Sequence, residues 1–163
     1  AWEGRKMLDY NMTPEEFYIQ YLQSLGKEND ISHGDFIVDK FGDSPQMADE
    51  LLEHVLSGLK TATCSALWEW ESEGGSIPKP GLLSVIVDGK DEPRCIIETV
   101  EVTIKNYNEV DAAFARDEGE GDLSLDYWRE AHKGFFTRTL PAIGKEFSEI
   151  MPLVCERFKV VWK

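Results

Sequence analysis

The stretch Val55-Leu56-Ser57-Gly58-Leu59-Lys60-Thr61-Ala62-Thr63-Cys64-Ser65-Ala66 carries the clearest structural signal in the chain. Apolar residues recur at helical spacing over 47–56, and Ser44-Pro45 has the form of a helix start. Gly58 follows the last apolar position, where a glycine commonly ends a helix. The threonines that come next favour strands. The stretch therefore predicts a helix over about 44–58 that leads into a strand, with a lysine and two hydroxyl groups at the junction.

The rest of the chain predicts short strands with helices between them. Thr13-Pro14 followed by a glutamate predicts a further helix over about 13–26. Apolar patterns predict strands over 35–41, 82–87, 95–104 and 154–162, and helices over 108–117 and 124–141. We expect a single α+β domain spanning 1–163, built on a small barrel-like sheet of mixed strands with surrounding helices.

Composition bears on the class of ligand. The chain has 31 acidic and 17 basic residues, which gives a net charge of −14. Proteins that bind long nucleic acids draw much of their affinity from lysine and arginine on phosphates, and an acidic chain repels such polyanions. The charge balance therefore favours a small neutral or cationic ligand and disfavours RNA.

Apolar runs and cysteines bear on location and metals. No apolar run approaches the roughly 18 residues that a membrane-spanning helix needs, so we expect no membrane association. Cys64, Cys95 and Cys155 lie far apart without a zinc-ligand spacing. We expect reduced thiols in a cytoplasmic protein with no metal and no cofactor, although Cys64 lies beside the suspected site and a reactive thiol there stays open.

Lys60 and Thr63 are the first candidates for chemistry. A threonine hydroxyl becomes a nucleophile when a base takes its proton, and a partly buried lysine can be that base. On a regular strand the two side chains would face opposite sides, so they converge only if the backbone bends between them. The alternative is a solvated lysine that precedes an ordinary strand.

An acidic segment, Ala115-Arg116-Asp117-Glu118-Gly119-Glu120-Gly121-Asp122, is the second candidate. Its carboxylates could serve acid–base chemistry or bind a hard cation. The segment could equally be an exposed turn between two helices.

Aromatic and histidine residues form the third candidate. Trp128 and His132 are four residues apart, so they share a helix face, and Arg129 is adjacent. Such groups could stack on and hydrogen-bond a base-like ring, or they could pack a core. Trp68 could roof a pocket. His33 and His54 have no catalytic company, and we interpret both as structural.

Taken in order, these blocks resemble the ASCH domain family, a relative of the PUA fold. The resemblance covers about 41–162, which makes the helix over 13–26 an addition. It implies a compact β-barrel with a cleft beside the lysine and threonines. The family was first proposed to bind RNA, and some small bacterial members remove an acyl group from the exocyclic amine of cytidine. Their lysine, threonine and glutamate match Lys60, Thr63 and Glu118, whereas Ser65 stands where they have an arginine.

The sequence therefore predicts an amidohydrolase of a small nucleoside-like, acylcytidine-type substrate. Lys60 would act as base, Thr63 as nucleophile, and Glu118 would hold or protonate the leaving amine. The residues expected to bind substrate are Thr61, Ser65, Trp68, Glu120, Trp128, Arg129 and His132. Two alternatives stay open: an RNA- or nucleotide-binding module without catalysis, and a metal-dependent ribonuclease with Glu118, Glu120 and Asp122 as ligands.

Overall fold

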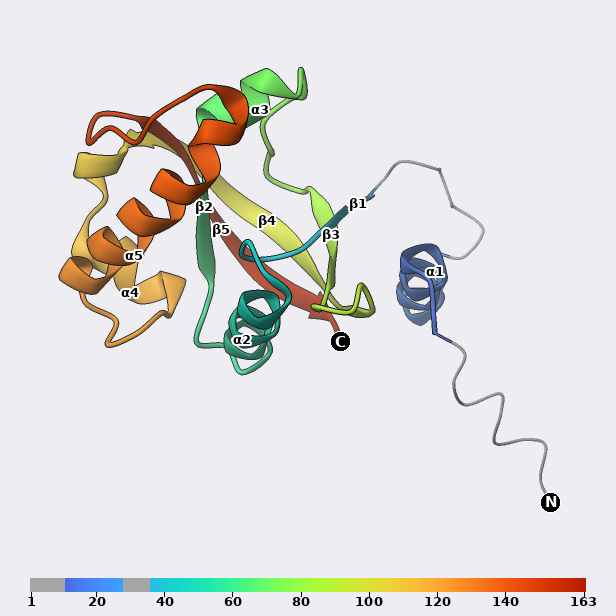
Figure 1. Cartoon of the computed structure of the whole chain (residues 1–163). Helices are drawn as coiled ribbons and strands as arrows, with labels where there is room; N and C mark the ends of the chain where they lie inside the picture. Colours follow the sequence, from blue (N-terminus) through green and yellow to red (C-terminus); the bar gives the residue numbers. More distant parts are fainter. Residues whose placement is uncertain (1–10, 28–35) are drawn as a thin grey trace.

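The computed structural model describes residues 11–27 and 36–163, whose strands form one five-stranded sheet (Figure 1). The strands are β1 (Phe36–Asp39), β2 (Ala62–Ala66), β3 (Leu83–Val87), β4 (Pro93–Asn106) and β5 (Pro152–Trp162). The α-helices are α1 (Pro14–Ser24), α2 (Pro45–Leu56), α3 (Leu67–Ser72), α4 (Ala112–Glu118) and α5 (Leu125–Thr139). Two short 3-10 helices are η2 (Tyr107–Glu109) and η3 (Leu140–Ile143).

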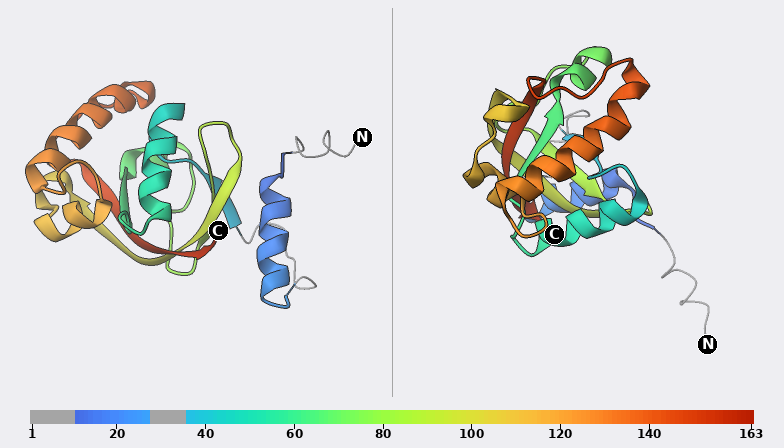
Figure 2. Two further views of the ribbon diagram at one scale, coloured as in Figure 1. Left: turned by 90° about the horizontal axis from the view of Figure 1, so that it is seen from below. Right: turned by 60° about the vertical axis from the view of Figure 1, so that its left-hand side comes forward.

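The sheet has the order β1-β3-β4-β5-β2. β1 runs parallel to β3, and the other neighbours are antiparallel. This mixed sheet with helices confirms the α+β class. The predicted barrel is not confirmed, because the edge strands β1 and β2 each pair with one neighbour and not with each other within the described residues. Figure 2 shows a curved sheet.

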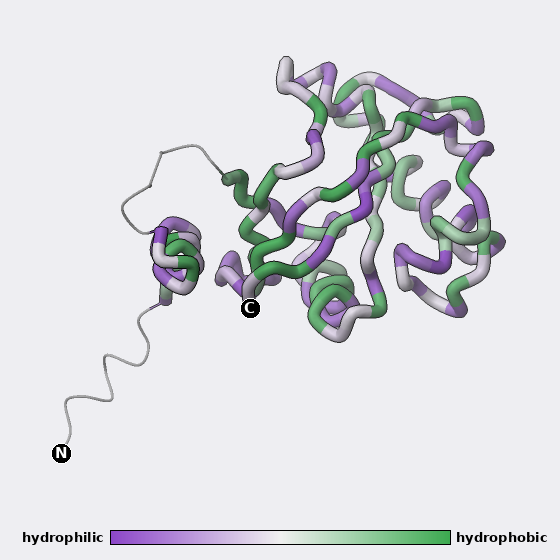
Figure 3. The backbone as a smooth tube through the Cα atoms, turned by 180° about the vertical axis from the view of Figure 1, so that it is seen from behind, coloured by the Kyte–Doolittle hydropathy of each residue, from purple (hydrophilic) through white to green (hydrophobic). Residues whose placement is uncertain are grey.

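Helices α1 and α2 cover opposite faces of the sheet. Successive residues of a strand point to opposite faces, and in β3 Val85 belongs to the cluster of α1, while Ile86 belongs to the cluster of α2. On the α1 side Tyr18 and Leu22 are buried, and on the α2 side Leu52 and Val55 are buried. Figure 3 shows both apolar and polar segments along β4 and β5, and the buried residues of β4 lie in its first half.

Helices α4 and α5 pack at the other end of the sheet, beside β2. Their buried side chains Phe114, Trp128 and Phe136 share a core cluster with β2 and β5. This third cluster places α5 and the end of α4 next to the strand that follows Lys60, which positions the site described below.

Helix starts agree closely with the sequence predictions. The side chains of Thr13, Ser44 and Ser124 each accept a hydrogen bond from the backbone N–H three residues later, as N-caps do.

The other predicted elements agree with the structure in part. The predicted strand over 35–41 corresponds to β1 (Phe36–Asp39), and Asp35 lies outside the described residues. The predicted helix over 108–117 is divided between η2 and α4, and α3 was not predicted. Across the described ranges, the structure contains no helix with the length and apolar character to cross a membrane.

Candidate functional site

Lys60 lies in the connection between α2 and β2, where the end of α4 meets it. The Lys60 amide donates to the His54 carbonyl at the end of α2 (3.0 Å), and the Thr61 amide donates to the Asp117 carbonyl in α4 (2.8 Å). Gly119 follows α4 with φ +75°, and a Cβ at this glycine would lie 2.7 Å from the Leu59 carbonyl oxygen. A glycine is therefore required for the close contact between the two segments.

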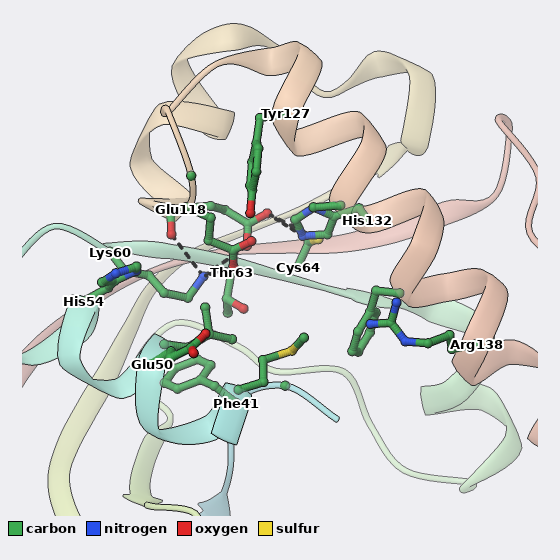
Figure 4. A pocket seen from close by; sticks show the side chains of 17 residues that line it. Phe41, Glu50, His54, Lys60, Thr63, Cys64, Glu118, Tyr127, His132 and Arg138 are labelled. Carbon is green, nitrogen blue, oxygen red and sulfur yellow. Dashed lines mark hydrogen bonds and ion pairs between the residues drawn. The ribbon is translucent and has the colours of Figure 1, made fainter. Parts of the chain in front are cut away.

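This contact brings Lys60 and Glu118 together as a buried ion pair (Figure 4). The Lys60 Nζ lies 3.1 Å from Glu118 Oε1, and the two residues are 2% and 1% exposed. Nζ also donates to the Glu118 carbonyl oxygen (3.3 Å) and to Glu120 Oε1 (3.5 Å). An ammonium has three protons, so the protein supplies an acceptor for each one.

The second carboxylate oxygen of Glu118, Oε2, also has several polar contacts. Glu118 Oε2 accepts a short hydrogen bond from the Trp128 indole N–H, and His132 Nε2 lies 3.1 Å from it. The Cys64 thiol donates to the same oxygen from 3.5 Å. The Trp128 and His132 rings stack with centroids 4.2 Å apart, as their spacing on one helix face predicted.

Charge compensation governs the protonation of this cluster. Burial would raise the pKa of the Glu118 carboxyl, but the charges of Lys60 and His132 outweigh burial and hold this pKa well below its usual range. Burial would lower the pKa of Lys60 and of His132, but Glu118 and Glu120 raise both. Burial raises the pKa of the Cys64 thiol well above its usual value. These shifts favour an ionised Glu118 carboxylate, a Lys60 ammonium and a neutral Cys64 thiol, and they shift His132 towards its protonated form.

Lys60, Thr63 and Glu118 face one cavity of about 200 Å³. Lys60 precedes the regular part of β2, so the strict alternation of a strand does not separate it from Thr63. The backbone between Lys60 and Thr63 is therefore not a regular strand, which is the condition under which the two side chains can face one cavity. Other residues that line the cavity include Phe41, Glu50, Leu51, His54, Cys64, Glu120, Tyr127, His132, Phe135 and Arg138.

Two of the residues expected to bind substrate, Glu120 and His132, line this cavity. Ser65 instead lines a neighbouring cavity of about 410 Å³, which shares Thr63 and Cys64 with the first. The Ser65 hydroxyl accepts a hydrogen bond from Trp70 Nε1 (2.8 Å). Ser65 is therefore next to the site without facing the Lys60–Glu118 pair.

Four other expected substrate-binding residues do not line the cavity. Trp128 is buried behind Glu118, so it holds the carboxylate and cannot stack on a ligand. Arg129 is exposed on α5, and Trp68 packs against the core cluster under Lys145. Thr61 is exposed and lies on the other side of the Lys60 connection. Sequence spacing could not separate these positions because it gives helix faces and not the cavity's direction.

His54 is a cavity residue that we interpreted from the sequence as structural. It lies in the last turn of α2 and lines the cavity, and its Nδ1 has no hydrogen-bond partner among the described residues. Its position one helical turn after Leu51, which also lines the cavity, was the available signal. His33 lies outside the described residues.

The donor atoms around Glu118 bear on whether the cluster could bind a metal ion. Within the described part of the chain, Cys64, Glu118 and His132 offer ligand atoms that lie within 4.8 Å of one another. A cation there would have to displace donors that already bind the Glu118 carboxylate. Asp122, a ligand in the ribonuclease alternative, is exposed and accepts from the Ser124 amide instead (2.9 Å). The donor set therefore fits an ion-pair network better than a metal site.

Comparisons with known proteins identify relatives of this chain. The family model described as the ASCH domain matches residues 36–162. The chain is similar to the crystal structure of an ASCH domain from Lactobacillus crispatus JV V101, with 39% identity, coverage of 92% of this chain and 94% of that chain, and a TM-score of 0.84. It is also similar to a protein from Enterococcus faecalis V583, with 38% identity, coverage of 91% and 87%, and a TM-score of 0.82. A search of curated proteins found no match.

Proposed function

The chain belongs to the ASCH domain family, and we propose that it hydrolyses an amide bond in a small nucleoside-like substrate of the acylcytidine type. The observation that carries the proposal is the cavity shared by Lys60, Thr63 and Glu118. A buried, charge-coupled lysine beside a hydroxyl in a cavity is the arrangement expected for an activated nucleophile.

Thr63 supplies the nucleophile in this proposal. Its hydroxyl oxygen attacks the acyl carbon, an acyl ester forms on Thr63, and the amine leaves with a proton. Water then hydrolyses the ester and releases the acid. Dividing one difficult amide cleavage into two steps is the advantage of covalent catalysis.

Lys60 is the base, and it reacts as the neutral amine, which is the less populated form in the resting site. In the resting site Lys60 is an ammonium with three acceptors, so it must release a proton to solvent water before it can accept the one from Thr63. The contact with Glu120 is the longest of the three, and Glu120 is the least buried acceptor, so a substrate can displace it. Lys60 then passes the Thr63 proton to the leaving amine.

Glu118 does not protonate the leaving amine in this proposal, and its role is to position Lys60. Its carboxylate is ionised and both oxygens accept hydrogen bonds, so it has no proton to give to a leaving amine. It anchors Lys60 beside the nucleophile.

Size and charge support a small substrate. Pockets for drug-sized ligands typically enclose about 300–1,000 Å³, and here the cavities of about 200 and 410 Å³ meet at Thr63 and Cys64. A substrate of one ring, a sugar and a short acyl group can place its amide at that junction. The net charge of −14 disfavours a long RNA.

The test measures cytidine release from cytidine acylated on its exocyclic amine, with the full chain in EDTA. We expect turnover that EDTA does not change, and a loss of about 10²–10⁴-fold in Lys60→Met, the range for removal of a general base. Lys133→Met, an exposed position on α5, is the matched control and should behave as the unsubstituted chain does.

Two results would favour one of the alternative functions over the amidohydrolase. RNA cleavage that EDTA abolishes would favour the metal-dependent ribonuclease. Binding of nucleotide or RNA without turnover of any acylcytidine would favour the binding module.

A further inference from the structure

The hydrogen bonds of His132 define its protonation state. Nδ1 lies 2.9 Å from the Trp128 carbonyl oxygen, and Nε2 lies 3.1 Å from Glu118 Oε2. A carbonyl and an ionised carboxylate accept hydrogen bonds and have none to donate, so both ring nitrogens must carry a proton. The geometry therefore describes an imidazolium and not a neutral imidazole.

The surroundings of His132 fix the ring in this position. It is buried, it stacks on Trp128, and Trp128 donates to the same carboxylate oxygen. As long as the ring is protonated, a second cation is thus held on the far side of the carboxylate that binds Lys60.

We propose that His132 is a positioning residue that shares Glu118 with Lys60 and so makes it easier for the Lys60 ammonium to release a proton. This inference rests on the proposed function in one respect, which is that Lys60 reacts as a base. The coupling between the two cations is a property of the site itself and can be measured without turnover.

Competition for one carboxylate explains the effect. Lys60 binds Oε1 and His132 binds Oε2, each at 3.1 Å, inside a buried site where charges interact strongly. With the imidazolium present, the carboxylate neutralises Lys60 only in part. Without it, the whole carboxylate charge acts on Lys60, which then holds its proton more tightly.

Other charged groups around the ring do not replace this effect. Those that line the same cavity come from every neighbouring element: Glu50 and His54 on α2, Lys60 and Cys64 at β2, Glu118 and Glu120 at the end of α4, and Tyr127 and Arg138 on α5. Of these, Glu118 is in direct contact with both cations.

The first measurement is an NMR titration of the His132 ring nitrogens. Equilibrium coupling is reciprocal, so removal of the Lys60 cation must raise the pKa of His132 as much as removal of His132 raises that of Lys60. We expect both ring nitrogens to be protonated at neutral pH, and the His132 pKa to rise by on the order of one unit in Lys60→Met. Lys133→Met, which removes an exposed charge next to His132, should leave it unchanged. A ring nitrogen without a proton at neutral pH, or an unchanged His132 pKa in Lys60→Met, overturns the inference.

The second measurement uses His132→Gln, which can keep an N–H donor toward Glu118 and removes the charge. At pH 6 we expect kcat/KM for acylcytidine to fall about tenfold. The difference should vanish as pH rises through the His132 pKa, because the unsubstituted chain then loses the same charge. A deficit of equal size at every pH means that the role of His132 is only structural and contradicts the inference. If the unsubstituted chain does not hydrolyse acylcytidine, the proposed function fails, and the NMR titration still decides the role of His132.

Discussion

The ammonium of Lys60 and the carboxylate of Glu118 lie 3.1 Å apart, although the two residues are 58 positions apart in the sequence. Lys60 reaches this position from the connection after α2, and Glu118 from the last turn of α4. Next to Glu118, the Gly119 backbone lies so close to the Leu59 carbonyl oxygen that a Cβ at this glycine would be 2.7 Å from it. The site is therefore built where the connection after α2 meets the end of α4 beside an edge strand, and its stability and its chemistry depend on the same contacts.

Glu118→Gln should destabilise the fold substantially. His132 would lose the carboxylate it contacts, Lys60 would keep as an ion pair only its 3.5 Å contact with Glu120, and breaking one side of a buried ion pair costs about 3–5 kcal/mol. Urea denaturation at pH 7 measures the free energy of unfolding. Glu120→Gln is the matched control, because Glu120 is less buried and makes one contact of 3.5 Å with Lys60. Equal stability of the two variants would contradict the ion-pair network.

Gly119→Ala should disrupt the site through the backbone. A Cβ would meet the Leu59 carbonyl at 2.7 Å, and the positive φ alone costs about 1–3 kcal/mol for other residues. Gly144→Ala is the control for the second effect, since Gly144 has a φ of +72° and open space around it. We expect both variants to lower Tm, and Gly119→Ala to lower it more and to reduce turnover. A fully active Gly119→Ala would show that the close approach is dispensable.

Cys64→Ser should keep hydrolytic activity. Burial and the nearby Glu118 charge raise the pKa of the Cys64 thiol, so at neutral pH the thiol is protonated and a poor nucleophile. A hydroxyl can still donate to Glu118. The assay is acylcytidine turnover together with the rate of iodoacetamide alkylation at Cys64, which should be slow. Loss of activity in Cys64→Ser as severe as in Thr63→Val would assign the nucleophile to the thiol.

Glu156 makes stability depend on pH near neutrality. Burial raises the pKa of the Glu156 carboxyl to about 7, from the ordinary value of 4.5 that the group has in the unfolded chain. Between these values the folded state binds a proton that the unfolded state has lost, so the stability contributed by this group falls as pH rises through the window. Glu156→Gln keeps an acceptor for the Thr99 hydroxyl. Its Tm should therefore exceed that of the unsubstituted chain at pH 8 and match it at pH 4.

The control for that titration is Glu130→Gln, at an exposed position on α5. The difference in Tm between this variant and the unsubstituted chain should not change between pH 4 and pH 8. A Tm difference for Glu156→Gln that is constant with pH would exclude a titrating carboxyl as its cause.

Local patterns predicted the helices and strands because their signals lie within a few residues of one another. Ser44, Ser124 and Thr13 act as the caps that their spacing indicated. The α+β class followed from the order of the elements. Whether the sheet closes into a barrel could not be predicted in this way, because closure requires β1 and β2 to pair with each other. In the structure β1 pairs with β3, and β2 pairs with β5.

The site was predictable only as far as local spacing and the family resemblance extend. Trp128 and His132 share a helix face as predicted, but only the packing of α5 shows that Trp128 lies behind Glu118 while His132 reaches the cavity. His54 was missed because its spacing from Leu51 indicates only a shared helix face, whereas the cavity beside that face forms only when α2 and α5 come together in the fold. The meeting of Lys60 with Glu118 depends on Gly119, a tertiary contact that no spacing encodes.

Thr63 is the residue on which the account depends most. The most direct measurement is the initial rate of cytidine release from acylated cytidine by Thr63→Val, with Thr61→Val as the matched control. Both variants replace a hydroxyl with a methyl group in the same segment, but Thr63 faces the cavity with Lys60 and Glu118, while Thr61 is exposed outside it. We predict that Thr63→Val loses turnover and Thr61→Val retains it. Retention of full turnover by Thr63→Val would contradict the account.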